Sequence, residues 1–147
     1  RAAARFRATH PERTLVVTAP APLPSLWLDP VLVLRVLDNL LENARKYSEV
    51  DTTITLTAHP RDGGVELAVT DRGIGIAAAD LPQVFTPFFR TDRSRSRATG
   101  GVGLGLGLAR RVLLAHGGTI AIASELDAGT TVTCTLPDRA APTTTTA

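Results

Sequence analysis

The sequence has few aromatic residues, one cysteine and no long apolar run, and each shortage narrows the choice of fold. Aromatic residues make up 4% of the 147 residues and hydrophobic residues 44%, so aliphatic side chains must fill the core of a single domain. The single Cys134 excludes an internal disulfide and gives no metal-ligand spacing, so we expect it to be a small buried residue. No apolar stretch reaches the roughly 18 residues of a membrane span, and no secretory signal opens the sequence. We therefore expect this segment to be soluble and intracellular.

Neither positive nor negative charge is in large excess. Sixteen basic and fourteen acidic side chains leave a net charge of +2, which is too small to indicate a nucleic acid or membrane partner. The one local cluster is the arginine-rich run from Arg90 to Arg97. We expect no nucleic acid partner.

Alternating apolar residues, turn residues and helix caps divide the sequence into short elements. We expect strands at 14–18, 26–28, 54–58, 65–70, 119–124 and 130–136, helices at 30–47 and 104–116, and a helical turn at 77–84. Hairpins are more evident than repeated strand–helix–strand units, which predicts an α+β fold: a two-layer α/β sandwich with helices on one face of a mixed, mostly antiparallel sheet. Residues 1–12 would end an upstream linker or helix, 13–137 form the domain, and 138–147 form a disordered tail.

The helix predicted at 30–47 has three faces, whereas a surface helix needs only two. One face is apolar and would pack on the core; it carries Val33, Leu34, Leu37, Leu40, Leu41 and Ala44. A second face carries Asn39, Asn43, Lys46 and Tyr47, and the remaining side, with Asp38, Glu42 and Arg45, is expected to face solvent. Amide oxygens suit Mg²⁺, and an ammonium one turn later could meet phosphates on the same ligand. A solvated polar face is the alternative.

Two glycine-rich segments offer backbone that a ligand could approach closely. In Asp71-Arg72-Gly73-Ile74-Gly75-Ile76, a carboxylate at a strand end could accept a hydrogen bond from the amino group of adenine, whereas guanine presents an acceptor there. A plain Asp-Gly turn is the alternative. In the segment Thr99 to Leu106, backbone amides at the start of a helix could cradle phosphate. It lacks the Lys-Ser/Thr of a P-loop and the contiguous strand, turn and helix of a dinucleotide fingerprint.

Three phenylalanines lie between these segments, at Phe85, Phe88 and Phe89, directly before Arg90. Exposed phenylalanines beside arginines would form a docking surface with a basic arm for phosphates. Alternatively, Phe85 and Phe88 anchor the core and the arginines belong to a solvated loop. The stretch from 85 to 103 is long for a connection in a compact domain, which is typical of a lid or binding loop.

In this order and spacing, the motifs resemble the histidine-kinase branch of the ATP-binding superfamily shared with DNA gyrase, the chaperone Hsp90 and the mismatch-repair protein MutL. Asn39 to Tyr47 is similar to the N box of that family, and Asp71 to Ile76 to its first glycine box. Phe85 to Arg90 is similar to the F box, and Gly101 to Leu106 to the second glycine box. The resemblance covers residues 13–137 and implies the Bergerat ATP-binding fold with a long ATP lid.

The resemblance implies a role for each matching residue. Asn43 would be the Mg²⁺ ligand, Asp71 the adenine-reading carboxylate, and Asn39, Lys46 and Arg90 the residues that act on the phosphates. The rest of the ATP-binding set would be Tyr47, Gly73, Gly75, Ile76, Gly101, Val102, Gly103, Leu104, Gly105 and Leu106. A lid at about 86–102 would close over ATP, and Phe85, Phe88 and Phe89 would dock to the histidine domain.

The implied reaction is transfer of the γ-phosphoryl of ATP to a histidine on a separate dimerisation domain of the same protein, for relay to a response regulator. The implied parent is a homodimeric membrane-bound sensor with this monomeric segment on its cytoplasmic side. The phosphoacceptor motif itself is absent here, and a helical hairpin with His-Glu is expected upstream. Gly107 departs from a usual alanine, at about 1 kcal/mol in helix propensity.

Three other assignments compete with this one. Gyrase-like ATPases place a glutamate base where this sequence has Asn39, which predicts slow ATP hydrolysis here. A serine kinase of the anti-sigma type shares the fold. A module that binds nucleotide only to regulate a partner is the third alternative.

Overall fold

The structure is a computed structural model that describes residues 1–91 and 103–139. Within these residues, three α-helices and five strands follow one another with one short 3₁₀ helix between them. In chain order they are α1 (Ala2–Thr9), β1 (Thr14–Thr18), α2 (Pro30–Tyr47), β2 (Thr53–Arg61), β3 (Gly64–Asp71), η1 (Leu81–Gln83), α4 (Gly105–Ala115), β4 (Thr119–Glu125) and β5 (Gly129–Pro137). Five of the six predicted strands and both predicted helices are present. Residues 140–147 of the predicted disordered tail lie outside the described residues.

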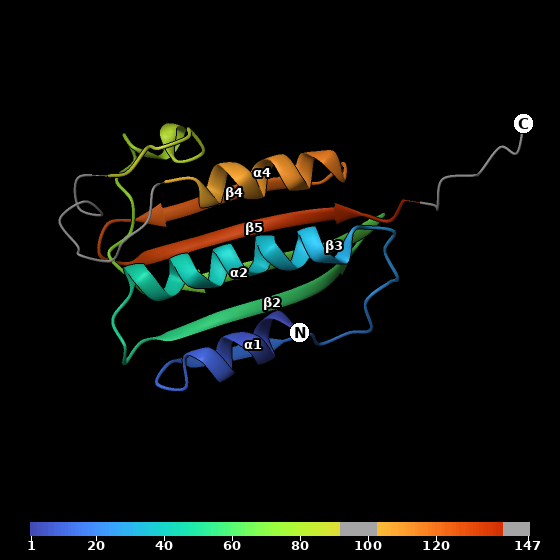
Figure 1. Ribbon diagram of the computed structural model, residues 1–147, viewed down its shortest axis with the longest axis horizontal. Helices are drawn as coiled ribbons and strands as arrows, with labels where there is room; N and C mark the ends of the chain where they lie inside the picture. The colour runs from blue at the N-terminus through green and yellow to red at the C-terminus, as the bar shows by residue number, and fades with distance from the viewer. Residues whose placement is uncertain (92–102, 140–147) are drawn as a thin grey trace, which may run out of the picture.

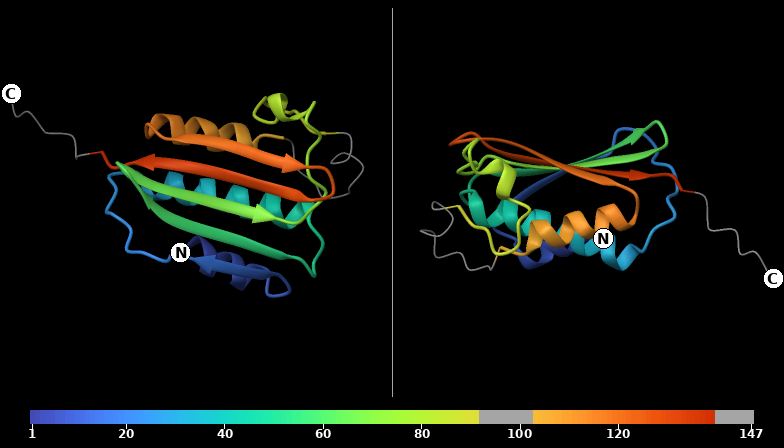
Figure 2. Two further views of the ribbon diagram at one scale, coloured as in Figure 1. Left: turned by 180° about the vertical axis from the view of Figure 1, so that it is seen from behind. Right: turned by 90° about the horizontal axis from the view of Figure 1, so that it is seen from above.

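The strands form one mixed sheet in the order β1-β2-β3-β5-β4. Only β1 runs parallel to its neighbour, and the other pairs are antiparallel. The helices cover one face of this sheet, as the view from above in Figure 2 shows, with α2 and α4 side by side in Figure 1. The predicted two-layer α+β sandwich is confirmed. Among the described residues, no helix has both the length and the hydropathy to cross a membrane.

Helix α2 begins where the sequence places its cap. The Asp29 carboxylate accepts hydrogen bonds from the Val31 and Leu32 amides at 2.9 and 3.1 Å, and Pro30 occupies the first turn. The helix then buries one face against the sheet, through Val33, Val36, Leu40, Leu41 and Ala44. The core is almost entirely aliphatic, as predicted, with Phe6 its one aromatic residue among those described, and Cys134 is buried in it.

The side of α2 that was expected to face solvent instead faces α1, so that expectation was wrong. Arg5 of α1 pairs with Asp38, and His10 Nε2 lies 3.4 Å from Glu42 Oε2. Phe6 of α1 is buried in the core and contacts His10 in a tilted arrangement, with ring centroids 5.1 Å apart. The charged residues on this side of α2 give no sign in the sequence that α1, which lies earlier in the chain, covers them.

The predicted strand at 26–28 was also wrong. Leu26 and Leu28 pack against the core while Trp27 between them is 62% exposed, so the alternation that suggested a strand is real. However, the segment has no neighbouring strand to pair with, because β1 pairs with β2 and the connection runs to the start of α2. Alternating burial therefore marks an extended connection laid along the core.

Helices α2 and α4 run in opposite directions, and a hydrogen bond joins the start of one to the end of the other. The Asp29 amide donates to His116 Nε2 at 3.0 Å, while His116 Nδ1 lies 2.8 Å from the Val112 carbonyl oxygen. Gly117, at φ +73°, ends α4 as the predicted glycine stop. At the opposite end of the helix pair, α2 ends beside the start of α4, and both helices border a cavity there.

Candidate nucleotide site

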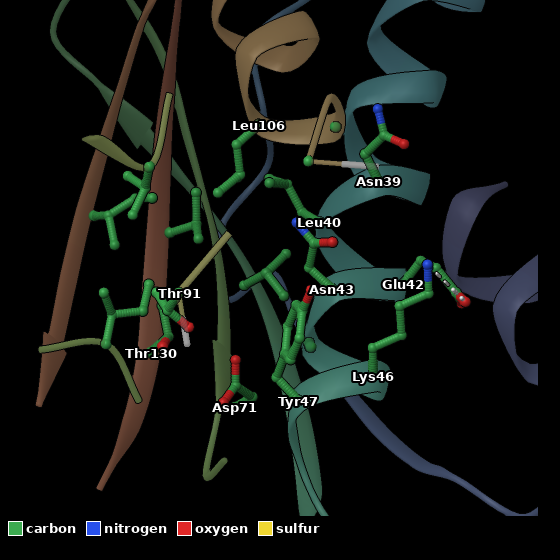
Figure 3. Close-up of a pocket in the computed structure, with 18 of the residues that line it drawn as sticks. Asn39, Leu40, Glu42, Asn43, Lys46, Tyr47, Asp71, Thr91, Leu106 and Thr130 are labelled. Atoms are coloured by element: carbon green, nitrogen blue, oxygen red, sulfur yellow. Dashed lines mark ion pairs between the residues drawn. The ribbon is translucent and has the colours of Figure 1, made fainter. Parts of the chain in front are cut away.

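A cavity of about 250 Å³ lies between the C-terminal half of α2 and the strands β3 and β5, next to the start of α4. Figure 3 shows α2 on one side of it and Asp71 on the other. Most of its lining is apolar, from Leu40, Ala44, Val69, Ile74, Ile76, Val84, Leu106, Ile122 and Val132. Its polar groups are gathered at a few positions, which is the usual composition of a small-molecule site.

The second face of α2 lines this cavity as predicted. Asn39, Asn43, Lys46 and Tyr47 all border it, because residues three, four and seven apart share one side of a helix. In Figure 3 Asn43 and Tyr47 lie on the side of α2 that faces Asp71, whereas the Lys46 side chain runs along α2 toward Glu42. Two amides, one ammonium and one phenol ring are therefore presented to the same space.

Asp71 closes the opposite side of the cavity at the end of β3. It is 9% exposed, and its Oδ1 accepts a hydrogen bond from the Gly73 amide at 2.8 Å. Burial raises the pKa of Asp71 from its ordinary 3.8 to about 6, while the Gly73 and Thr130 amides and the Arg13 guanidinium oppose that rise. The carboxylate is thus ionised at neutral pH but close to its titration range, and it can accept a hydrogen bond from a ligand.

The glycines after Asp71 are required by close backbone contacts on both sides. A Cβ on Gly73 would lie 2.0 Å from the Tyr47 carbonyl oxygen, which also accepts a hydrogen bond from the Ile74 amide at 3.0 Å. Gly75 has φ +67°, and a Cβ there would lie 1.9 Å from the Glu125 carbonyl oxygen. This segment is therefore fixed between the end of α2 and the turn that joins β4 to β5.

The start of α4 forms the third side of the cavity. Gly103 has φ +74°, and its carbonyl oxygen accepts a hydrogen bond from the Phe88 amide at 3.1 Å. Gly105 is the first residue of the helix, and a Cβ added to it would lie 3.7 Å from the side-chain amide carbon of Asn39. A Cβ on Gly107 would lie 2.9 Å from the Phe85 carbonyl oxygen. The glycine that departs from the family pattern therefore allows the phenylalanine segment to approach α4.

The three phenylalanines have different surroundings. Phe85 lies beneath the Arg110 guanidinium, with 5.4 Å between that group and the ring centroid, and is half-buried. Phe89 and Arg90 line the cavity. Phe88, at φ +64°, is 70% exposed. Because Phe85 is only half-buried and Phe88 is at the surface, neither of them is an anchor buried in the core.

The structure brings most of the predicted site residues to one cavity. Those that line it are Asn39, Asn43, Lys46, Tyr47, Asp71, Gly75, Ile76, Gly103, Leu104, Gly105, Leu106, Phe89 and Arg90. Gly73 acts through its amide on Asp71. Gly101, Val102, most of the predicted lid and the arginines at 93, 95 and 97 lie outside the described residues.

Several lining residues were not predicted. Thr130, Ile122 and Val132 come from the last hairpin, and Glu42 comes from the side of α2 that was expected to face solvent. The register of β3 with β5, which sets Asp71 opposite Thr130, brings the hairpin to the site. The pair Gly129-Thr130, which lies where the family that the sequence resembles has a Gly-Thr before its last strand, was the available signal for Thr130. Nothing in the sequence marks Ile122 and Val132 as lining.

Comparison with known proteins decides the family. Residues 28–140 match the model of the family described as histidine kinase-, DNA gyrase B-, and HSP90-like ATPase. The chain belongs to this ATPase family. The match includes every element of the cavity, from α2 to β5, so the site lies within the shared domain.

The relatives of this ATPase-family chain are sensor kinases. It is 39% identical over 138 residues to the sensor-like histidine kinase SenX3 of Mycolicibacterium smegmatis, covering 93% of this chain and 36% of the relative. It is 40% identical over 112 residues to the sensor histidine kinase WalK of Bacillus subtilis, covering 75% of this chain and 18% of that protein. The chain thus spans about a third or less of the curated relatives it matches.

Solved structures show the same fold. A mycobacterial sensor histidine kinase, MprB, superposes with a TM-score of 0.79 at 29% identity and covers 95% of this chain and 91% of its own. Full-length ShkA in complex with AMPPNP gives a TM-score of 0.78 at 29% identity, over 96% of this chain and 29% of that one. The ATPase-family domain described above is therefore a recurring unit within larger sensor kinases.

Proposed function

We propose that this domain binds ATP with Mg²⁺ in the cavity between α2 and β3. We further propose that it transfers the γ-phosphoryl group to a histidine on a separate dimerisation domain of the same protein. The observation that carries the proposal is the meeting of four α2 side chains, two of them amides and one an ammonium, with a buried carboxylate across one apolar cavity. Triphosphate and adenine are the two ligand parts that this arrangement suits.

Asp71 would read the base. An ionised carboxylate accepts a hydrogen bond from the exocyclic amino group of adenine and repels the carbonyl oxygen that guanine carries at that position. The apolar lining around it, with Ile76, Leu106 and Ile122, suits a flat aromatic ring. Tyr47 borders the same part of the cavity and would lie against the nucleotide.

Asn43 would hold Mg²⁺ together with phosphate oxygens and water. The described residues contain no cluster of three or more His, Cys, Asp or Glu side chains that could hold a metal alone, so a cation here would arrive with its nucleotide. A hard amide oxygen on a mostly apolar wall fits Mg²⁺, which takes few protein ligands and many from phosphate and water. The bound ion would neutralise phosphate charge; Asn39, Lys46 and Arg90 would orient the phosphates by hydrogen bonds and charge.

The partners follow from the same proposal. The exposed Phe88 would dock to the histidine-bearing domain with Phe85 and Phe89 behind it, and the phosphohistidine would pass its phosphoryl group to a response regulator. The parent would be a homodimeric membrane sensor with this domain in the cytoplasm. The kinship with full-length sensor kinases, of which this chain matches only a part, supports these assignments.

Calorimetry with the 147-residue chain tests the site. Asn43→Ala should remove the Mg²⁺-dependent part of ATP binding and leave adenosine binding unchanged, because the amide acts on the metal and phosphates alone. If Asn43→Ala binds MgATP as the parent does, Asn43 is not the metal ligand.

The acid stability of the phosphorylated product separates the kinase classes. When the domain is mixed with a dimerisation domain that carries its histidine, labelled phosphate should enter that domain in an acid-labile, alkali-stable form. An acid-stable phosphoserine on another partner would identify an anti-sigma-type serine kinase instead.

The gyrase-type ATPase alternative depends on Asn39. An amide cannot take a proton from water, so the isolated chain should hydrolyse ATP slowly. Rapid Mg²⁺-dependent turnover by the chain alone would favour the ATPase and count against the kinase.

A further inference from the structure

Ser124 of β4 lies at the centre of a small hydrogen-bond network next to the cavity. Its Oγ accepts a hydrogen bond from the Ile76 amide at 2.8 Å and donates one to the Gly129 carbonyl oxygen at 2.9 Å. It also lies 2.8 Å from the hydroxyl oxygen of Thr130, its partner across the β4–β5 pair. Ile76 and Thr130 line the cavity, whereas Ser124 does not. Ser124 therefore holds two lining residues from outside the cavity.

The number of protons in this network decides how the Thr130 hydroxyl is used. A serine hydroxyl has one proton to donate and two lone pairs that accept. The Gly129 carbonyl oxygen can only accept, so it takes the proton of Ser124. The two lone pairs of Ser124 are then filled by the Ile76 amide and by the hydroxyl proton of Thr130. In this arrangement all three contacts of Ser124 are hydrogen bonds at once.

Thr130 lies beside Asp71, where the base is proposed to bind. The two residues are partners in the β3–β5 register, and the Thr130 amide donates a hydrogen bond to the Asp71 carboxylate. Figure 3 shows both residues across the cavity from α2. Because its proton goes to Ser124, the Thr130 hydroxyl has only lone pairs to offer a ligand. At neutral pH this side of the cavity therefore presents two acceptors, a carboxylate and a hydroxyl oxygen.

A hydroxyl fixed in this way bears on which base the cavity selects. Given the proposed nucleotide site, on which this depends, we infer that Ser124 is a positioning residue for base selection: by accepting the proton of Thr130, it fixes that hydroxyl as an acceptor for the amino group of adenine. Ser124 acts through Thr130 and does not touch the nucleotide. Hypoxanthine carries a carbonyl oxygen in place of the amino group, and two fixed acceptors repel it.

Loss of the Ser124 hydroxyl should leave the Thr130 hydroxyl able to turn. Ser124→Ala removes the acceptor that holds the proton of Thr130, so that proton becomes available to a ligand. A carbonyl oxygen on the base then gains a donor, while an amino group loses a fixed acceptor. The variant should therefore discriminate less between adenine and hypoxanthine, whereas a merely looser hairpin would weaken the binding of both bases alike.

Calorimetry of the 147-residue chain with Mg²⁺ and either ADP or inosine diphosphate isolates this effect. The two ligands carry the same phosphates and differ only at the edge of the base that bears the amino group or the carbonyl oxygen. We expect Ser124→Ala to lower the ratio of ADP affinity to inosine diphosphate affinity about fivefold to tenfold, the scale of one neutral hydrogen bond. Ser124→Thr keeps the hydroxyl and should keep the parental ratio.

A double-mutant cycle with Thr130→Val shows whether Ser124 acts through the Thr130 hydroxyl. Thr130→Val should lower the same ratio by a similar factor, and adding Ser124→Ala to it should lower the ratio no further. Thr131→Val is the matched control, because Thr131 is the next residue of β5, lies on the other face of the sheet and pairs its hydroxyl with that of Thr70 at 3.0 Å. The control should change the ratio by less than about twofold.

The outcomes separate the possible failures. If Ser124→Ala keeps the parental ratio, or lowers it equally with and without the Thr130 hydroxyl, the inference is wrong while the proposed function stands. If Ser124→Ala does not fold, Ser124→Cys takes its place under the same criteria, because a thiol has a similar shape and accepts only weakly. If the parent binds neither diphosphate, the proposed function fails together with the inference.

Discussion

The two ends of the cavity, one proposed for the base and the other for the phosphates, differ in what holds their residues in place. At the base end, Asp71, Gly73 and Gly75 are fixed by backbone hydrogen bonds and by contacts too close for a side chain. At the phosphate end, Lys46 and Arg90 offer charge on long side chains, and Lys46 Nζ lies 4.0 Å from Glu42 Oε1. The base end is part of the fold, whereas the phosphate end depends on side chains that can rearrange.

This difference predicts that substitutions at the base end change stability and binding together, while substitutions at the phosphate end change binding alone. A rigid recognition end costs less ordering on binding, which favours selection of one base. A mobile charged end suits a phosphate chain whose terminal group must leave during the reaction. The predictions below test how sharply this division holds.

The largest effect should come from Gly75→Ala. A Cβ there would lie 1.9 Å from the Glu125 carbonyl oxygen and would sit at φ +67°, so crowding and backbone strain add up to about 3 kcal/mol of lost stability. Urea unfolding measures the loss.

Gly63→Ala is the matched control for that variant. Gly63 has φ +74° but nothing within 4 Å of an added Cβ, so the strain alone should cost about 1 kcal/mol. Equal losses in the two variants would contradict the close packing of Gly75 against the last hairpin.

Asp71→Asn should show the second largest effect, on binding. The new side chain keeps the shape of the carboxylate, and its oxygen can still accept the hydrogen bond from the backbone N–H of Gly73. Because it is neutral, its hydrogen bond to adenine should be weaker. Adenosine affinity should fall about tenfold to a hundredfold by calorimetry. Unchanged affinity would remove Asp71 from base recognition.

The same variant should be more stable than the parent at neutral pH. Because burial raises the pKa of Asp71 to about 6, the folded state binds a proton more tightly than the unfolded state, and the carboxylate lowers stability as the pH rises from about 4 to 6. Asp71→Asn should therefore gain about 1–2 kcal/mol at pH 7.5 by urea unfolding.

The gain should shrink toward pH 4, where Asp71 of the parent is protonated. Adenosine binding to the parent should weaken below pH 6 for the same reason, since an ionised carboxylate accepts the hydrogen bond from the base more strongly than a protonated one. A loss of stability in Asp71→Asn at pH 7.5 would mean that the charge has partners beyond the amides and Arg13.

Much of the fold and of the base end could be predicted from the sequence, because local signals specify them. Asp29-Pro30 marks the start of α2, paired glycines mark close backbone contacts, and a carboxylate at a strand end marks one side of the cavity. What failed depends on partners distant in sequence. Glu42 was expected to face solvent because α1 was not known to pack there, and Trp27 was placed in a strand that lacks a neighbour.

The smallest effect on stability should come from Lys46→Met. Ion pairs of a solvent-accessible lysine, such as the one that Lys46 makes with Glu42 at 4.0 Å, contribute little, so the unfolding free energy should change by less than about 0.5 kcal/mol. Affinity for the non-hydrolysable ATP analogue AMPPNP should nevertheless fall about tenfold relative to adenosine, because the ammonium contacts phosphate only. A large loss of stability would contradict the division between a structural base end and a side-chain phosphate end.

The most direct test of the central claim uses the fact that Lys46 is the only lysine in the sequence. An acyl-phosphate derivative of ATP transfers its acyl group to an amine held beside the phosphates, and mass spectrometry locates the label. The account predicts labelling of Lys46, prevented by excess MgATP and weakened by Asp71→Asn, which disturbs only the base end. A label on the N-terminal amine alone, or labelling of Lys46 that MgATP does not prevent, would contradict it.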